Sequence, residues 1–266
     1  MTTLVPFWTI DPGQVQVGLL ALIRLSGLLL LAPPVQAGSV PVSVRVGLAF
    51  SLVLLVWHDI ATRRPPVAPD VMTLGGYAAT ELGIGIAIGF AGRLIVSIAS
   101  FAAELVSHQM GLGLAGLLDP ALGQTVSPLA RLFDWTVMIL FLALDGHYLL
   151  LGAVVESFRV IPPGHTAQLA AASNALVSLG SRVFSVGMAI VAPTLGLLFL
   201  ANLALVLVSR TVPQLNLMGV GFPILILLGL GLITLNLDLV AGLMGGEIRN
   251  LESILVTVIR SLAYGG

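Results

Sequence analysis

The chain has 266 residues, of which 58% are hydrophobic and only 9% are charged, and its formal net charge at pH 7 is −1. A soluble protein of this length could not hide so much apolar surface, so the composition predicts an integral membrane protein. The small net charge gives no reason to expect a nucleic-acid partner, and the absence of cysteine excludes disulfides, thiolate metal sites and cysteine nucleophiles.

Long apolar stretches follow one another along the chain, separated by proline pairs and Gly-Pro clusters, which end helices. None shows the alternation of a strand, so the sequence predicts an all-α, polytopic membrane fold of about six long helical segments, some of them kinked. A span needs about 20 residues, and all but the second stretch reach that length. The stretches cover 14–32, 40–57, 71–107, 129–156, 167–208 and 217–243.

Most segments of the first half contain charges that lipid disfavours. A charge at the bilayer centre costs at least ~2.5–3.5 kcal/mol, and such residues normally face protein or water. Several in one half indicate packing against partner proteins or the lining of a wet path, while pairing inside one compact bundle stays open as the simpler alternative. The candidate buried charges are Arg24, Glu81, Arg93, Glu104, Asp145 and His147.

The segment 109–127 is Gly-rich and ends in a polar turn between two membrane-length stretches. Irregular backbone at membrane depth is tolerated only inside protein or beside a water-filled cavity. The segment is therefore either a plug-like, re-entrant loop or an ordinary surface loop. The residues that would form the plug are Gln109, Met110, Gly111, Gly113, Gly116, Asp119, Pro120 and Gln124.

The stretch 167–208 is too long for one simple crossing, because its helix would extend roughly 60 Å. Pro193 predicts a kink within it. Runs without charge survive mainly at 183–208 and 211–237. These two runs are the parts best suited to an apolar environment.

No constellation for catalysis is visible, so the sequence predicts neither an enzyme nor a cofactor or metal site. Gly111 to Gly116 fit G-x-G-x-x-G, but they follow a long apolar helix and not the strand that dinucleotide binding requires. The four histidines lie in four different regions without metal-ligand spacing. Gly85 and Gly89 have the G-x-x-x-G spacing that allows close helix approach, although membrane helices are often Gly-rich without such a role.

Three stretches in order resemble the FliR family of flagellar export-gate proteins and its injectisome counterparts, the SctT proteins. The first is Gln109–Gly113 with Asp119-Pro120 and Gln124. The second is Phe141–His147 with Ser157-Phe158 and Ile161-Pro162. The third is Ser209–Asn216 with Val220–Pro223. The resemblance covers nearly the whole chain.

This resemblance implies a non-catalytic component of the flagellar type III protein export gate in the basal body of the bacterial inner membrane. With FliP and FliQ homologues, and alongside FlhB and FlhA homologues, such a protein forms the channel for unfolded flagellar subunits. It also implies one helical domain over 1–266, with helices and the plug-like loop in 1–165 and a hairpin resembling FliQ in 166–266. The hairpin turn would contain Arg210, Pro213, Gln214, Asn216, Gly221 and Pro223.

A small-molecule or ion transporter is the alternative. It would use Glu81, Arg93, Glu104 and Asp145 as a substrate path. Inverted repeats or paired broken helices would favour it, and the sequence shows neither convincingly.

Overall fold

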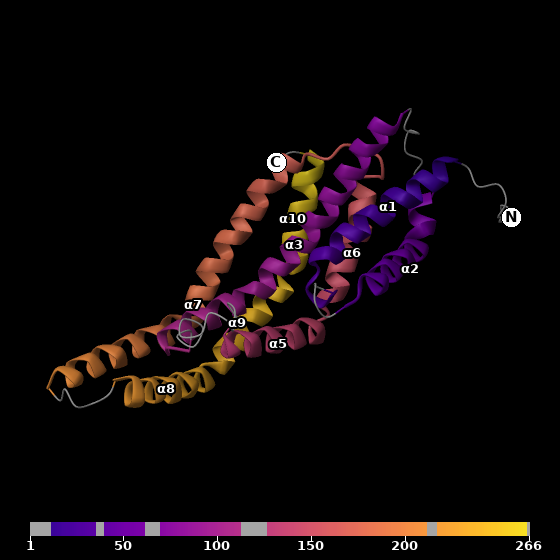
Figure 1. Ribbon diagram of the computed structural model, residues 1–266. Helices are drawn as coiled ribbons and strands as arrows, with labels where there is room; N and C mark the ends of the chain where they lie inside the picture. The colour runs from indigo at the N-terminus through magenta and orange to yellow at the C-terminus, as the bar shows by residue number, and fades with distance from the viewer. Residues whose placement is uncertain (1–11, 36–39, 62–69, 113–126, 212–216, 265–266) are drawn as a thin grey trace. The chain divides into compact units, whose positions relative to one another are not determined.

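The computed structural model describes residues 12–35, 40–61, 70–112, 127–211 and 217–264, and all regular structure within these ranges is helical (Figure 1). The predicted all-α fold is confirmed. Within the same ranges three helices are long and apolar enough to cross a membrane, and the number rises to five if each of two bent helix pairs counts as one span. The three are Gly13–Leu31, Val71–Gln109 and Leu169–Thr211.

Each helix of the first half begins at a proline or directly after a proline or polar residue. The backbone N–H of Thr73 donates to Asp70 Oδ1 at 3.0 Å where α3 begins, and hydrogen bonds from Thr73 lower the pKa of this exposed carboxyl. At the start of α5, Ser127 accepts from the N–H of Ala130 at 3.1 Å and Pro128 occupies the first turn. The elements are α1 (Pro12–Leu31), η1 (Pro33–Val35), α2 (Val42–Ala61), α3 (Val71–Gln109), α5 (Pro128–Ala143) and α6 (Gly146–Val160).

The sequence predicted one continuous segment over 129–156. The structure instead divides it into two helices, α5 and α6. Asp145 has a φ of 59°, the one positive φ among the described non-glycine residues. Asp tolerates this left-handed conformation better than most residues, because its short side chain can hydrogen-bond locally. An α-helix cannot continue through a residue in this conformation. Helix α5 therefore ends before Asp145 and α6 begins after it.

The second half contains α7 (Leu169–Thr211), η3 (Leu217–Gly221), α8 (Phe222–Leu235), α9 (Leu237–Arg249) and α10 (Leu251–Tyr264). Pro193 lies inside α7, which continues on both sides of it. The predicted segment 217–243 is wrong in its extent, because it breaks at Asn236, whose backbone N–H and side chain both bond to the Leu232 carbonyl. Helix α10 was not predicted, because its charged outer face interrupts the apolar run.

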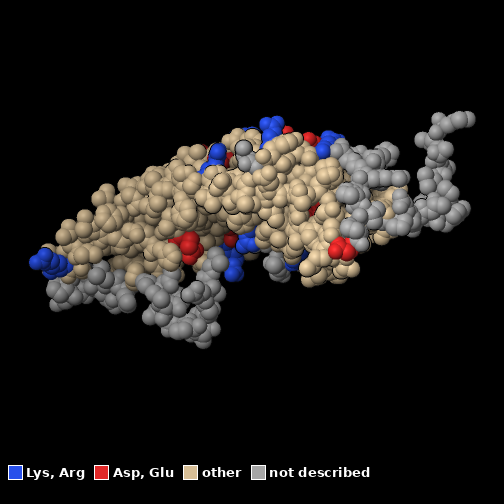
Figure 2. All heavy atoms as spheres, turned by 90° about the horizontal axis from the view of Figure 1, so that it is seen from above, with Lys and Arg blue, Asp and Glu red and all other residues tan. Residues whose placement is uncertain are grey.

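The chain forms two compact units. Unit 1 comprises Met1–Arg93, Asp145–Leu179 and Asn250–Gly266, and unit 2 comprises Leu94–Leu144 and Gly180–Arg249. Each unit takes residues from both sides of the predicted division at 165/166, and that division stays a prediction. On the face shown in Figure 2, charged side chains are scattered between long uncharged stretches, as expected of a membrane protein.

Candidate functional site

Helices α1 and α3 of unit 1 approach each other closely through glycine. A Cβ atom on Gly85 would overlap the carbonyl oxygen of Arg24, and one on Gly89 would lie 2.6 Å from the carbonyl oxygen of Leu28. From the other side, a Cβ on Gly27 would lie 2.7 Å from the carbonyl oxygen of Leu82. These obstacles are backbone atoms, which cannot rotate away, so only glycine permits this contact.

The close contact brings Arg24 of α1 to Glu81 of α3. Arg24 Nε donates to Glu81 Oε2 at 2.6 Å, and both side chains are completely buried. Arg24 Nη1 donates to the hydroxyl of Ser157 at 3.0 Å, and Nη2 donates to the carbonyl oxygen of Ile161 at 2.9 Å. The guanidinium carbon lies 4.3 Å from the centre of the Phe158 ring.

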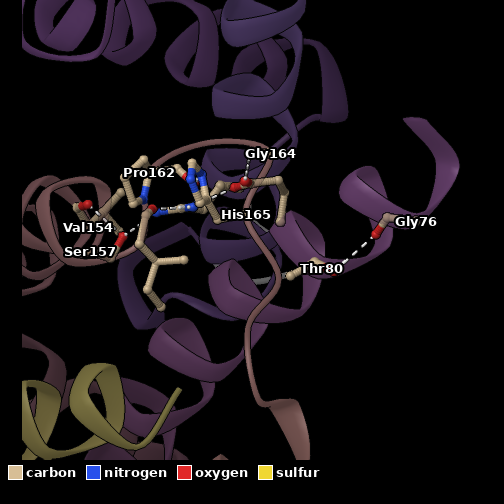
Figure 3. A network of polar contacts seen from close by, with 10 residues as sticks. Gly76, Thr80, Val154, Ser157, Pro162, Gly164 and His165 are labelled. Carbon is tan, nitrogen blue, oxygen red and sulfur yellow. Dashed lines mark hydrogen bonds and ion pairs between the residues drawn. The ribbon is translucent and has the colours of Figure 1, made fainter. Parts of the chain in front are cut away.

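The carboxylate is bound on its other side as well. Glu81 Oε1 accepts from the backbone N–H of Gly164 at 3.0 Å, and the Ser157 hydroxyl donates to the carbonyl oxygen of Val154 at 2.7 Å (Figure 3). The stretches Ser157-Phe158 and Ile161-Pro162, which contribute to the family resemblance, therefore supply partners of Arg24. We call these contacts of Arg24, Glu81, Ser157, Ile161 and Gly164 the buried network.

The contacts of the buried network stabilise the fold of unit 1. Breaking such an ion pair by removing one partner costs about 3–5 kcal/mol, because a buried charge is left without compensation. The contacts connect α1, α3, α6 and the turn after α6, so they fix four separate parts of unit 1 relative to one another. We infer that the network holds unit 1 in one defined arrangement.

In unit 2 the residues on either side of 113–126 meet each other. The hydroxyls of Ser107 in α3 and Ser127 before α5 lie 2.8 Å apart, and both residues are buried. Ser127 also caps α5. The described residues that flank 113–126 are therefore joined by a buried hydrogen bond. We call Ser107, 109–112 and Ser127 the loop root.

The loop root also contacts α7 and α8 within unit 2. Asn202 Nδ2 of α7 donates to the carbonyl oxygen of Gln109 at 3.2 Å. Met110 is fully buried, and a Cβ on Gly229 of α8 would lie 2.6 Å from its sulfur. Gly111 has a φ of 80°, and a Cβ there would lie 2.5 Å from the Phe222 ring.

Of the predicted plug residues, Gln109, Met110 and Gly111 lie at this root. The others, Gly113, Gly116, Asp119, Pro120 and Gln124, lie outside the described residues, and the plug role stays a prediction.

The predicted hairpin-turn residues divide in the same way. Arg210 is exposed in the last turn of α7, Gly221 is buried at the end of η3, and Pro223 is exposed in the first turn of α8. Pro213, Gln214 and Asn216 lie outside the described residues. Their role in assembly stays a prediction.

The buried network, as defined above, does not include the other four predicted buried charges. Arg93 and Asp145 are exposed, and His147 is half-buried beside Tyr148, with 4.3 Å between ring centres. Glu104 is half-buried and its Oε1 lies 3.5 Å from His108 Nε2. From this set, Arg24 and Glu81 meet in a buried ion pair.

Sequence reasoning missed the ion pair of Arg182 in α7 with Glu247 in α9. Its two hydrogen bonds measure 2.7 and 3.0 Å. Arg182 is the single charge in 167–208, and an isolated charge in a long apolar helix indicates a partner elsewhere in the chain. Nothing in the sequence identifies Glu247 as that partner.

Comparison with known proteins finds the family described as bacterial export proteins, family 1, which matches residues 15–251. The flagellar biosynthetic protein FliR of Escherichia coli is 32% identical over 245 residues, covering 91% of this chain and 92% of FliR. FliR of Bacillus subtilis is 29% identical, covering 92% of this chain and 93% of its own length. The Yop proteins translocation protein T of Yersinia pestis is 30% identical over 187 residues, covering 69% of this chain and 70% of its own length.

Proposed function

Because this chain belongs to family 1 of the bacterial export proteins, we propose that it assembles with homologues of FliP and FliQ into the export gate of a flagellar type III secretion apparatus. The family membership predicted from the three sequence stretches is confirmed, as are a non-enzymatic role in export and location in the inner membrane. FlhB and FlhA homologues are proposed as further partners, and unfolded flagellar subunits as the cargo.

One observation carries the proposal. The family match from residue 15 to residue 251 contains the whole buried network and both sides of the loop root. The features that fix the local structure therefore lie inside the matched region, and the identity to E. coli FliR extends over nine-tenths of both proteins.

The exposed apolar surface supports a role in assembly. Large side chains are exposed on several helices, including Leu55 of α2 at 79%, Trp135 of α5 at 64%, Phe199 of α7 at 60% and Leu227 of α8 at 72%. Apolar surface on this scale marks contact with lipid or with protein. In a gate subunit, this apolar surface would be covered by the other subunits and by the membrane.

Co-expression tests the assembly directly. The chain, tagged for affinity purification, is expressed with the FliP and FliQ homologues of its own bacterium and extracted in mild detergent. We expect both partners to be recovered with the chain through affinity and size-exclusion steps. Recovery of the chain alone would overturn the proposal.

We propose that residues 113–126 act with the loop root as a plug that closes the gate at rest. Removing six residues from this segment should then let small solutes and ions leak through the assembled gate, because the occluding segment no longer reaches across. The measurement is the permeability of cells that produce the complete gate. Shortening 62–69 by the same number of residues is the matched control and should leave permeability unchanged, and an equally tight gate after both deletions would contradict the plug.

The transporter alternative gives a different result with the purified chain alone. A transporter would move its solute across the membrane of liposomes without further subunits, whereas a gate subunit should support no selective solute flux. Selective flux by the isolated chain would favour the transporter.

A further inference from the structure

Helices α6 and α10 of unit 1 pack against each other. Their side chains border an open groove with a volume of about 510 Å³. One wall is a row of residues at every fourth position of α6, namely Tyr148, Gly152, Glu156 and Val160. Residues four apart form a straight ridge along a helix. We call this feature the α6–α10 groove.

The opposite wall has the same construction. Glu252, Val256, Arg260 and Tyr264 recur at every fourth position of α10, and apolar side chains such as Leu255 and Ile259 form the floor. The backbone N–H of Gln168, soon after α6 ends, donates to the carbonyl oxygen of Leu262 near the end of α10 at 2.8 Å. The two helices therefore run in the same direction, and their ridges border the groove over about 18 Å.

This shape suits an α-helix. Two parallel ridges with a channel between them accept the ridge of a third helix, as in ordinary helix packing. The channel is widened at Gly152, where an added Cβ would meet no atom within 4 Å. Tyr148 and Tyr264 stand at its two ends with exposed fractions of 65% and 76%.

The charges of the groove select the occupant. Glu252 and Arg260 have no ion-pair partner within the part of the chain that the structure describes, and they lie eight residues apart on α10, about 12 Å along the helix. Glu156, which also lines the groove, is paired with Arg159 at 3.3 Å. A lipid chain would leave both unpaired charges without a counter-ion.

We propose that the α6–α10 groove binds an α-helix of a neighbouring export-gate subunit. That helix places an aliphatic ridge on the floor, a Lys or Arg opposite Glu252, and an Asp or Glu about two turns away opposite Arg260. The assignment of the helix to a gate subunit rests on the proposed function, whereas the shape and charge of the groove do not.

Filling the groove tests the inference. Gly152→Leu places a side chain in open space, so the chain should fold, but the groove should no longer admit a helix. We expect the amount of FliP and FliQ homologue recovered with the tagged chain to fall at least tenfold. Gly75→Leu in α3, where an added Cβ also meets nothing within 4 Å, is the matched control and should stay within twofold of wild type.

Two outcomes are separable. If the wild-type chain recovers no partner, the proposed function fails. If the wild-type chain and Gly152→Leu recover partners equally, the proposed function stands and the groove inference is overturned.

Labelling gives a second measurement that does not depend on how Gly152→Leu folds. Because the chain contains no cysteine, Val256→Cys introduces one thiol inside the groove and Thr257→Cys introduces one on the exposed side of α10. Maleimide should react with Val256→Cys at least tenfold more slowly in the purified complex than in the chain alone in the same detergent. Thr257→Cys should react at the same rate in both. Equal rates for Val256→Cys, or equal protection of both positions, would overturn the inference.

Discussion

Replacing Arg24 with leucine should destabilise the folded chain by about 3–5 kcal/mol. The substitution leaves the Glu81 carboxylate completely buried, and among the described residues the Gly164 N–H is its remaining hydrogen-bond partner. It also removes the donors to Ser157 and Ile161 and the cation over the Phe158 ring. The measurement is the thermal unfolding midpoint of the purified chain in detergent, which should fall well below that of the wild type.

Two further variants identify the cause of that loss. Arg159→Gln removes the Arg–Glu ion pair with Glu156, whose side chains are about half exposed. Exposed ion pairs contribute only ~0–1 kcal/mol to the free energy of unfolding. The double variant Arg24→Leu/Glu81→Leu removes both buried charges and should recover part of the stability, because an apolar pair needs no counter-ion. An Arg24→Leu chain as stable as Arg159→Gln would contradict the role given to the buried network.

The next largest effect is expected at Gly85. In Gly85→Ala the new Cβ overlaps the Arg24 carbonyl oxygen, so α1 must move away from α3. Overpacking of this kind costs about 1–3 kcal/mol. Because the same movement draws Arg24 away from Glu81, we expect the upper end of that range.

Gly76→Ala on the same helix is the matched control. A Cβ at Gly76 meets nothing within 4 Å, and alanine favours a helix over glycine by up to ~1 kcal/mol, so this variant should be as stable as wild type or slightly more so. Circular dichroism during heating would compare the two. Equal midpoints for Gly85→Ala and Gly76→Ala would show that the close α1–α3 contact is absent.

The sequence predicted the parts of the fold that depend on local properties. Apolar length and proline placement identify most helices, and the charges in α1 and α3 indicate that these segments need protein or water around them. Breaks within apolar runs are less visible. The break at Asp145 comes from one residue with a left-handed backbone, in a stretch that otherwise reads as continuous helix.

The buried network could not be predicted from the sequence. Arg24 and Glu81 are 57 residues apart, and no spacing rule connects them or joins either one to Ser157. Gly85 and Gly89 were visible as G-x-x-x-G, but their partner was not, because a small-residue pattern does not say which helix approaches it. Family resemblance singled out Ser157-Phe158 and Ile161-Pro162, and only the structure relates them to Arg24.

If this protein is a required subunit of a flagellar export gate, flagellar subunits cannot be exported without it. The most direct test is to delete the gene in the source bacterium and measure flagellar subunits inside the cells and in the medium. We expect the subunits to be made but retained, and export to return when the wild-type chain is supplied from a plasmid. Undiminished export from the deletion strain would contradict a required role in the gate.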